Sequence, residues 1–311
     1  MNHNVKGFHH ITAIASEAKR NLTFYTEVLG LRLVKKTVNF DDPGTYHFYF
    51  GNETGTPGTI LTFFPWQGVP KGRQGTGMST EVGYAVPAGS LPFWKERLAR
   101  FGFSVSQSGT RFGEAFITFE DPDGMPLSLI EPVTADDREP WVTEEINKDV
   151  AIRGFHSTTL MLRTVENTAA VLTEVLGYEL AGKEGYRHRY ITRAVPTAAT
   201  VDLLEAPQQS PGVGAAGTIH HIAFRVENEE AQEEIRKQVD ERGLNVTPKI
   251  DRNYFFSIYF REPGGVLFEV ATDNPGFTVD ESIEELGTHL MLPPRYEPRR
   301  AEIEKVLPAL A

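Results

Sequence analysis

The chain has 311 residues, of which 40% are hydrophobic and 23% are charged, and its formal net charge is −11. This length favours about two domains, and the acidic balance argues against a nucleic-acid-binding surface. The absence of cysteine excludes disulfides, cysteine-ligated metal clusters and a thiol nucleophile.

The first residues, MNHNVKGFHH, contain no apolar run of the kind that a signal peptide needs. No stretch of the sequence approaches the roughly 18 consecutive apolar residues of a membrane span. We therefore expect a cytoplasmic protein that contacts neither a membrane nor nucleic acid.

The first predicted unit covers residues 5–66. Its alternating stretch HHITAIA predicts a strand. The following segment, 16–30, predicts a helix, because Leu22, Tyr25, Val28 and Leu29 fall on one face and Gly30 favours its end. Three strand-like runs come next, and a joint rich in glycine and proline follows. The order of this unit is therefore β-α-β-β-β.

The same order recurs along the chain. GFHHIT at 7–12 resembles GFHSTT at 154–159, and TEVLG occurs at both 26–30 and 173–177, at the same offset. FEDPDG at 119–124, which reads as a turn, resembles FREPGG at 260–265. These matches predict four units at about 5–66, 77–132, 151–206 and 217–272.

A single unit leaves one sheet face bare, and pairing two units buries that face. We therefore predict an α+β fold in which four βαβββ modules pair into two curved-sheet, open-barrel domains. The predicted divisions are an N-terminal pair of modules at 1–140, a C-terminal pair at 150–275, and a tail at 276–311 that packs on the body. Within the tail, DESIEELG at 280–287 predicts the start of a capped helix.

Units one and four carry metal-binding residue types at positions where units two and three carry hydroxyls. The aligned pairs are His10 with Ser157, His221 with Thr80, and Glu269 with Ser128. Two histidines and one carboxylate form the facial triad of non-haem Fe(II) oxygenases, which leaves coordination positions open for two reactants. A single histidine on a strand is more often a packed or surface residue than a metal ligand. The triad forms only if unit one pairs with unit four, which requires the Nε2 atoms of His10 and His221 to lie within about 5 Å.

These units and the H…H…E set resemble the vicinal oxygen chelate superfamily, which includes glyoxalase I, extradiol dioxygenases and bleomycin-resistance proteins. The chain most closely resembles the hydroquinone-type ring-cleaving dioxygenases of that superfamily. The resemblance is carried by GFHHIT, by DRNYFFSIYFREPGGVLFEVATDNPGF at 251–277, and by ESIEELGTHLMLPPRYEPRR at 281–300 in the tail.

The resemblance implies an Fe(II)-dependent extradiol-type dioxygenase that incorporates two oxygen atoms into a hydroquinone- or catechol-like ring. Its partners would be a small aromatic substrate and dioxygen. Mn(II) is an alternative metal, and Zn or Ni can occupy such a site in purified protein. The sequence does not identify the ring substituents, and exposed sheet edges with an extended tail are compatible with a homodimer.

The resemblance also assigns roles to individual residues. It implies metal ligands at His10, His221 and Glu269, substrate contacts at Thr12, Arg252 and Tyr259, and catalytic roles for His9, His220 and Tyr259. His9 and His220 are candidates for proton transfer, and a structural hydrogen-bonding role is equally open. Adjacent residues of a regular strand face opposite ways, so either role near the metal requires a β-bulge or a sharp twist.

The remaining polar residues leave alternatives open. Arg252 and Tyr259 are an odd number of residues apart and are expected on different strands. Arg252 either balances phenolate charge or pairs with Asp251 or Glu262, and Tyr259 either donates its hydroxyl or packs. His47 and His188 are predicted to be exposed strand residues.

Two other functions are compatible with the sequence. The first is a divalent-metal isomerase or lyase of glyoxalase type, which usually presents four protein ligands where this chain offers three. The second is a non-catalytic, bleomycin-resistance-like binding protein, which need not keep a metal site. Oxygen uptake with an aromatic substrate separates these functions from the dioxygenase.

Overall fold

The structure, a computed structural model, describes residues 5–310, and the predicted order βαβββ occurs four times in it. Unit one contains β1 (Phe8–Ala15), α1 (Ala18–Thr23) with the π-helical turn η1 (Phe24–Val28), β2 (Arg32–Val38), β3 (Tyr46–Gly51) and β4 (Ile60–Pro65). Unit two contains β5 (Met78–Ala85), α2 (Leu91–Arg100), β6 (Gln107–Arg111), β7 (Glu114–Glu120) and β8 (Pro126–Glu131).

The second half repeats this order. Unit three contains β9 (Gly154–Leu162), α3 (Glu166–Glu174), β10 (Glu179–Glu184), β11 (Arg187–Ile191) and β12 (Thr200–Glu205). Unit four contains β13 (Thr218–Val226), α4 (Glu229–Glu241), β14 (Ile250–Asp251), β15 (Phe255–Arg261) and β16 (Leu267–Pro275). The tail adds two 3₁₀ turns, η2 (Phe277–Val279) and η3 (Glu297–Arg299), and the helix α5 (Arg300–Val306).

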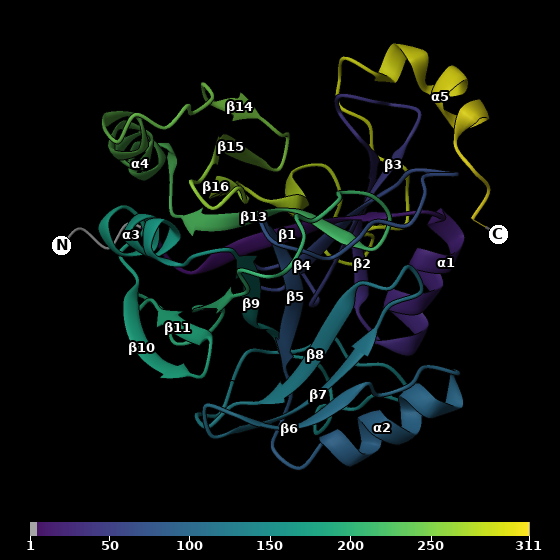
Figure 1. Ribbon diagram of the computed structural model, residues 1–311. Helices are drawn as coiled ribbons and strands as arrows, with labels where there is room; N and C mark the ends of the chain where they lie inside the picture. Colours follow the sequence, from purple (N-terminus) through teal and green to yellow (C-terminus); the bar gives the residue numbers. More distant parts are fainter. Residues whose placement is uncertain (1–4, 311) are drawn as a thin grey trace.

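The sixteen strands form two curled sheets of eight strands each (Figure 1). The first sheet has the order β14-β15-β16-β13-β1-β4-β3-β2, and the second has the order β10-β11-β12-β9-β5-β8-β7-β6. Unit one therefore pairs with unit four, and unit two pairs with unit three. This topology confirms the α+β fold of four paired modules. Each sheet contains strands from both halves of the chain, so the predicted division into 1–140, 150–275 and 276–311 describes the order along the chain and stays a prediction. Residues 1–4 and 311 lie outside the described part.

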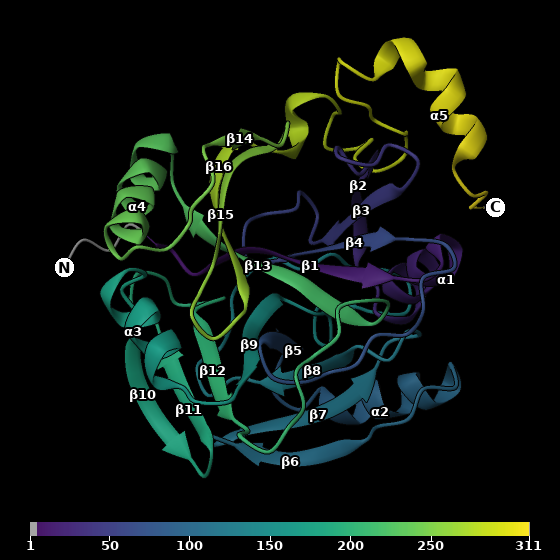
Figure 2. The same cartoon turned by 45° about the horizontal axis from the view of Figure 1, so that its top comes forward.

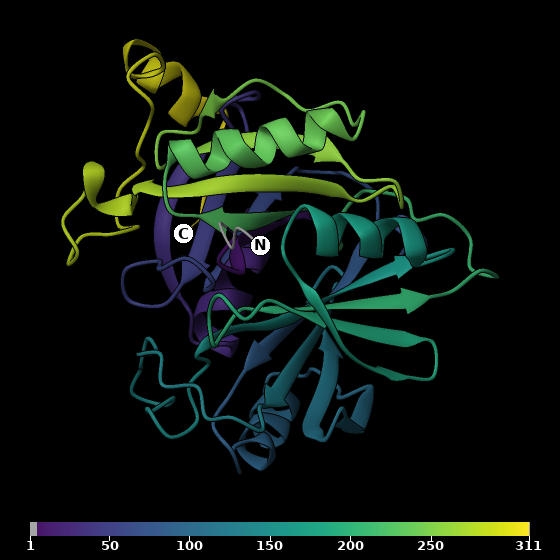
Figure 3. The same ribbon diagram turned by 90° about the vertical axis from the view of Figure 1, so that its left-hand side faces the viewer.

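Helices cover the outer faces of the sheets. Figure 3 shows α4 packed over the strands of unit four and running roughly along them, and the side-chain amide of Gln232 on this helix donates to the carbonyls of Phe256 and Val270 in that sheet. Asn228 caps α4, and Gly243 follows its end with a φ of 72°. Within residues 5–310, no helix is both long and apolar enough to cross a membrane.

Strands β1 and β13 pair antiparallel in the middle of the first sheet, and each contains one extra residue. Phe8 faces Phe224 while His10 faces Ala223, so His9 is the extra residue of β1. Thr12 faces His221 while Ala13 faces Ile219, so His220 is the extra residue of β13. A β-bulge is therefore present at each His-His pair, as a role of both histidines near the metal would require.

The tail packs against the β2 side of the first sheet, as Figure 2 shows. The buried ammonium of Lys35 on β2 contacts Asp280 at 2.6 Å and Glu281 at 2.5 Å. Farther along, the Tyr296 hydroxyl donates to the Phe40 carbonyl at 2.8 Å. The predicted helix at 280–287 is wrong, because this segment forms turns instead. In the first turn of a helix, the carboxylates of Asp280 and Glu281 would accept from backbone N–H groups of that helix. Here they contact the ammonium of Lys35 instead.

The FEDPDG segment forms the predicted turn, and it docks on unit one. The hydroxyl of Tyr25 donates to Asp121 at 3.1 Å, and the backbone N–H of Ser16 donates to Asp123 at 2.9 Å. Asp121 is buried, and this burial raises its pKa to about 6, with nearby Asp123 adding to the shift. The carboxyl of Asp121 is therefore easier to protonate in the folded protein than in the unfolded chain.

This raised pKa predicts a pH-dependent stability. In the unfolded chain Asp121 ionises near its ordinary pKa of about 3.9, so its contribution is complete below about pH 4 and is lost as the pH rises through about 6. Compared with Asp121→Asn, the wild type should lose about 3 kcal/mol of unfolding free energy over that range. Urea denaturation at several pH values measures this difference. The exposed control Asp137→Asn should show no such trend, and equal curves for the wild type and Asp121→Asn would contradict the prediction.

Candidate metal centre

Three side chains from units one and four converge on the concave side of the first sheet. His10 lies on β1, His221 on β13 and Glu269 on β16, which are neighbouring strands. The two Nε2 atoms are 3.4 Å apart, within the limit of about 5 Å that the triad requires. Glu269 Oε2 lies 2.8 Å from His221 Nε2 and 3.3 Å from His10 Nε2. All three side chains are buried.

The orientation of these atoms fits a shared cation better than mutual hydrogen bonds. Although Glu269 Oε2 lies close to both imidazoles, it has no hydrogen-bond partner within the described residues, so neither ring N–H is directed at it. Adjacent ligand atoms of an octahedral ion with bonds of about 2.1 Å are about 3.0 Å apart. The observed separations of 2.8, 3.3 and 3.4 Å match this spacing. The three residues therefore fit a divalent metal.

The carboxylate is held in its ionised form. Burial alone would raise the pKa of Glu269, but the neighbouring His10 and His221 hold it well below its ordinary value. Its other oxygen, Oε1, accepts a short hydrogen bond from the Ser257 hydroxyl on β15. Ser257 thus fixes one oxygen and leaves the second facing the two imidazoles.

The bulged histidines contact the far nitrogen of each candidate ligand. His9 Nδ1 lies 3.0 Å from His10 Nδ1, and His220 Nδ1 lies 2.7 Å from His221 Nδ1. Since His10 and His221 present Nε2 to the centre, their Nδ1–H groups donate to these neighbours. Burial lowers the pKa of His9 well below its ordinary value, which keeps its imidazole neutral and able to accept.

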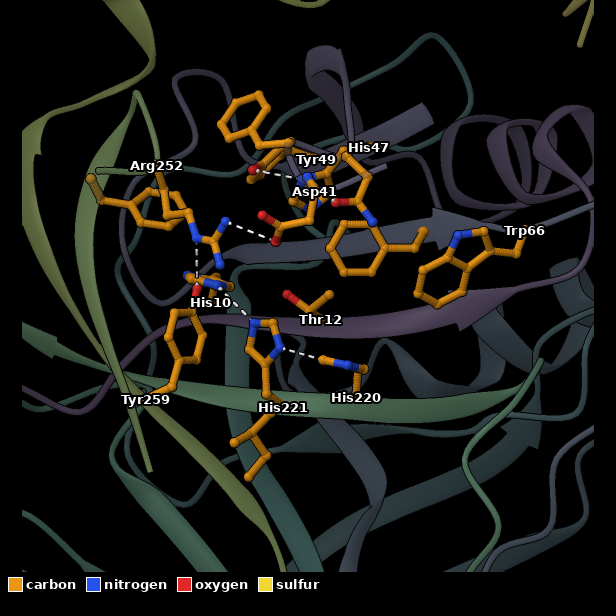
Figure 4. Close-up of a pocket in the computed structure, with 15 residues that line it drawn as sticks. His10, Thr12, Asp41, His47, Tyr49, Trp66, His220, His221, Arg252 and Tyr259 are labelled. Atoms are coloured by element: carbon orange, nitrogen blue, oxygen red, sulfur yellow. Dashed lines mark hydrogen bonds and ion pairs between the residues drawn. The ribbon is translucent and has the colours of Figure 1, made fainter. Parts of the chain in front are cut away.

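A cavity of about 370 Å³ opens in front of the cluster (Figure 4). Its volume lies within the roughly 300–1,000 Å³ of small-molecule sites. It is lined by two of the predicted metal ligands and by residues predicted to bind or act on a substrate: His10, His221, Thr12, His220, Arg252 and Tyr259. Aromatic side chains form much of the remaining wall, namely Phe40, His47, Tyr49, Phe64, Trp66 and Phe255. His9 instead borders a separate cavity beside residues 54–57 and 276–278.

Arg252 and Tyr259 meet at the edge of this cavity. Tyr259 lies within β15, whereas Arg252 follows β14 and lies outside the strands, so the two residues do not share one regular strand. The Arg252 Nε–H donates to Tyr259 Oη at 3.2 Å. The predicted ion pair of Arg252 with Asp251 or Glu262 is not the one observed, because its guanidinium contacts Asp41 at 3.1 Å, across the mouth of the cavity.

The prediction that His47 is exposed is wrong. His47 is buried and lines the cavity, whereas His188 is partly exposed. The alternation in TYHFYF places His47 on the same face as Tyr49, and this face covers the centre. The alternation in this strand could have indicated from the sequence that His47 and Tyr49 share one face. Trp66 and Asp41, which lie outside strands, carried no comparable signal.

The second sheet carries a different set at the equivalent positions. Thr12 and Thr159 end the matching segments GFHHIT and GFHSTT. His221 faces Thr12 in the first sheet, and Glu81 faces Thr159 in the second, so the counterpart of His221 is Glu81 rather than the expected Thr80. The carboxylate of Glu81 accepts from Arg111 at 2.7 Å. Within residues 5–310, His10, His221 and Glu269 form the one group of three or more residues placed to hold a metal.

The sequence matches the model of the Glyoxalase/Bleomycin resistance protein/Dioxygenase superfamily over residues 7–129 and 154–270. It is 47% identical over 97% of its length to a Bacillus subtilis protein named "Putative ring-cleaving dioxygenase MhqO", covering 95% of that protein. It is 38% identical over 97% of its length to the chlorohydroquinone/hydroquinone 1,2-dioxygenase of Sphingobium indicum, covering 96% of that protein.

Solved structures show similar folds. A Bacillus subtilis crystal structure described as a "putative dioxygenase" superposes with a TM-score of 0.95 at 46% identity, over 100% of this chain and 99% of that one. Glyoxalase I from Zea mays superposes with a TM-score of 0.65 at 17% identity, over 91% of this chain and 97% of that one. The second likeness concerns the fold alone.

Proposed function

Because the chain belongs to the Glyoxalase/Bleomycin resistance protein/Dioxygenase superfamily, we propose that it is a ring-cleaving dioxygenase that opens hydroquinone-like aromatic rings and depends on Fe(II). The observation that carries the proposal is the convergence of His10, His221 and Glu269 beside an aromatic-lined cavity. The two relatives described above, which are named as a ring-cleaving dioxygenase and a hydroquinone dioxygenase, align over nearly the whole chain.

In this proposal His10, His221 and Glu269 hold the metal. Fe(II) bound there would supply open coordination positions for a ring oxygen and dioxygen and a route for electron transfer between them. The cavity wall supplies flat aromatic surfaces, including Phe64, Trp66 and Phe255, against which a planar ring packs. The net reaction adds both atoms of dioxygen to the substrate and breaks one carbon–carbon bond of the ring.

Arg252 and Tyr259 act on the charge of the substrate. A hydroquinone bound through one ionised oxygen brings a negative charge into the cavity, and the guanidinium of Arg252 balances it. Tyr259 accepts from Arg252, and burial raises the pKa of its phenol well above the ordinary value. Its proton therefore stays on Oη and is available to donate to substrate or dioxygen.

His9 and His220 orient the two ligand imidazoles through the Nδ1 contacts described above. His220 also borders the cavity, so a role in proton transfer is proposed for this residue. His9 borders a different cavity, and its proposed role is to position His10.

Oxygen consumption tests the proposed function. Protein loaded with Fe(II) under nitrogen should consume oxygen when methylhydroquinone is added, and a yellow ring-opened product should accumulate. Loading with Mn(II) or Zn(II) in parallel identifies the metal that supports turnover. Conversion of a hemithioacetal without oxygen consumption would instead favour the glyoxalase-type function. Failure of both reactions would contradict the proposal.

A further inference from the structure

Four buried side chains form a continuous row of hydrogen bonds along the cavity wall. Thr12 Oγ1 lies 2.8 Å from Thr62 Oγ1, and Thr62 Oγ1 lies 2.9 Å from His47 Nε2. His47 Nδ1 in turn lies 2.9 Å from Tyr49 Oη. Thr12, His47 and Tyr49 line the cavity, and Figure 4 shows Thr12 beside His10 and His221. The row therefore connects the far wall of the cavity to the candidate metal centre.

The row can point in only one of two directions. Thr62 is fully buried, and a buried hydroxyl proton is rarely left unpaired, so the Thr62 hydroxyl donates to one of its two partners and accepts from the other. Burial lowers the pKa of His47 well below its ordinary value, so its ring is neutral and carries a single N–H. Each member is thus a donor on one side and an acceptor on the other.

Tyr49 fixes the direction. Burial raises the pKa of Tyr49 well above its ordinary value, so the phenol keeps its proton. Within residues 5–310, His47 Nδ1 is the hydrogen-bond partner of Tyr49 Oη, so the buried O–H donates to that nitrogen. His47 then carries its proton on Nε2 and donates to Thr62, which donates to Thr12. The hydroxyl proton of Thr12 is left facing the cavity.

We propose that the row Tyr49–His47–Thr62–Thr12 directs the hydroxyl proton of Thr12 at an ionised oxygen of the aromatic substrate, with His47 and Thr62 as positioning residues. The inference rests on the proposed function and deepens it, because it specifies a phenolate oxygen rather than a neutral hydroxyl beside the centre. A hydrogen bond to an ionised acceptor is about twice as strong as one to a neutral acceptor, so the direction of the row favours the ionised form.

Substrate binding without turnover tests this inference. Calorimetry of the metal-loaded protein under nitrogen measures the dissociation constant of methylhydroquinone. Thr62→Val keeps the shape of the side chain and removes the hydroxyl, so Thr12 is no longer held as a donor, and the dissociation constant should rise about tenfold. Thr62→Ser restores the hydroxyl and should recover most of the affinity. A change below about twofold for Thr62→Val would overturn the inference.

A matched variant separates this effect from general destabilisation. Thr118 is also a buried strand threonine, and its hydroxyl lies 2.9 Å from that of Ser128 in the second sheet. Thr118→Val should lower the unfolding free energy without changing methylhydroquinone binding. A protein that binds methylhydroquinone tightly but consumes no oxygen would contradict the proposed function while leaving the binding test valid.

The protonation site of His47 provides a second, ligand-free test. Long-range proton–nitrogen NMR correlations distinguish the two neutral tautomers of histidine. His47 should carry its proton on Nε2 in the wild type, and Tyr49→Phe should populate both tautomers because the fixed donor is gone. A proton on Nδ1 in the wild type would reverse the row and overturn the inference.

Discussion

Replacing Glu269 with glutamine should lower metal affinity and oxygen consumption by more than about a hundredfold. Mutating a residue that hydrogen-bonds to a metal ligand typically costs about 10–100-fold, and changing the ligand itself should cost more. The carboxylate is buried, ionised and aimed between two imidazoles. A glutamine amide has similar size but no charge, so it cannot balance a divalent cation at this position. Metal content by mass spectrometry and oxygen electrode rates measure the effect.

Two further variants make the Glu269 experiment specific. Ser257→Ala removes the hydroxyl that holds Oε1 and should cost about tenfold in metal affinity, a smaller loss than that of Glu269→Gln. Glu205→Gln on β12 makes the same chemical change in the second sheet and should leave metal content unchanged. A Glu269→Gln protein that keeps stoichiometric metal and the wild-type rate would mean that another carboxylate serves as the ligand.

Replacing Glu281 with glutamine should lower the unfolding free energy by about 3 kcal/mol, the typical cost of removing one partner of a buried ion pair. Lys35 is fully buried, and Glu281 is one of its two carboxylate partners, the other being the partly exposed Asp280. Without Glu281, the ammonium remains in a low-dielectric site with less compensation. Urea denaturation followed by circular dichroism measures the loss.

The double variant Lys35→Met/Glu281→Gln distinguishes an uncompensated charge from lost packing. Methionine fills the site without a charge, so the double variant should be more stable than Glu281→Gln alone. The exposed Glu284→Gln, in the same tail segment, should unfold like the wild type. If the double variant were less stable than the single one, the destabilisation would come from packing rather than from the buried charge.

The fold and the candidate metal centre could be predicted because they depend on repeated local patterns. Matching segments such as GFHHIT and GFHSTT define the units, and comparison of sister units singles out His10, His221 and Glu269. The predicted need for a bulge at each His-His pair is confirmed by the register of β1 and β13. The strand alignment of unit two was off by one residue, because the spacing between the first strand and the end of the helix differs between units two and four, and the counterpart of His221 is Glu81.

The rest of the site depends on contacts between distant segments, which a single sequence does not display. His47 reads as an ordinary polar strand residue until β3 is known to face the cavity. The Arg252–Asp41 pair joins residues from units four and one across an opening that only the closed sheet creates. The DESIEELG segment has a helical pattern, but a buried lysine 246 residues away determines where its acidic side chains point.

The pairing of β1 with β13 also determines how early in synthesis the candidate metal centre can form. His10 and His221 are separated by 211 residues, and Glu269 comes later still. During translation the edge of β1 that pairs with β13 stays unpaired until the chain has left the ribosome as far as Val226. Binding of a metal by all three residues would consequently be a late event, because a chain that ends before β16 lacks Glu269.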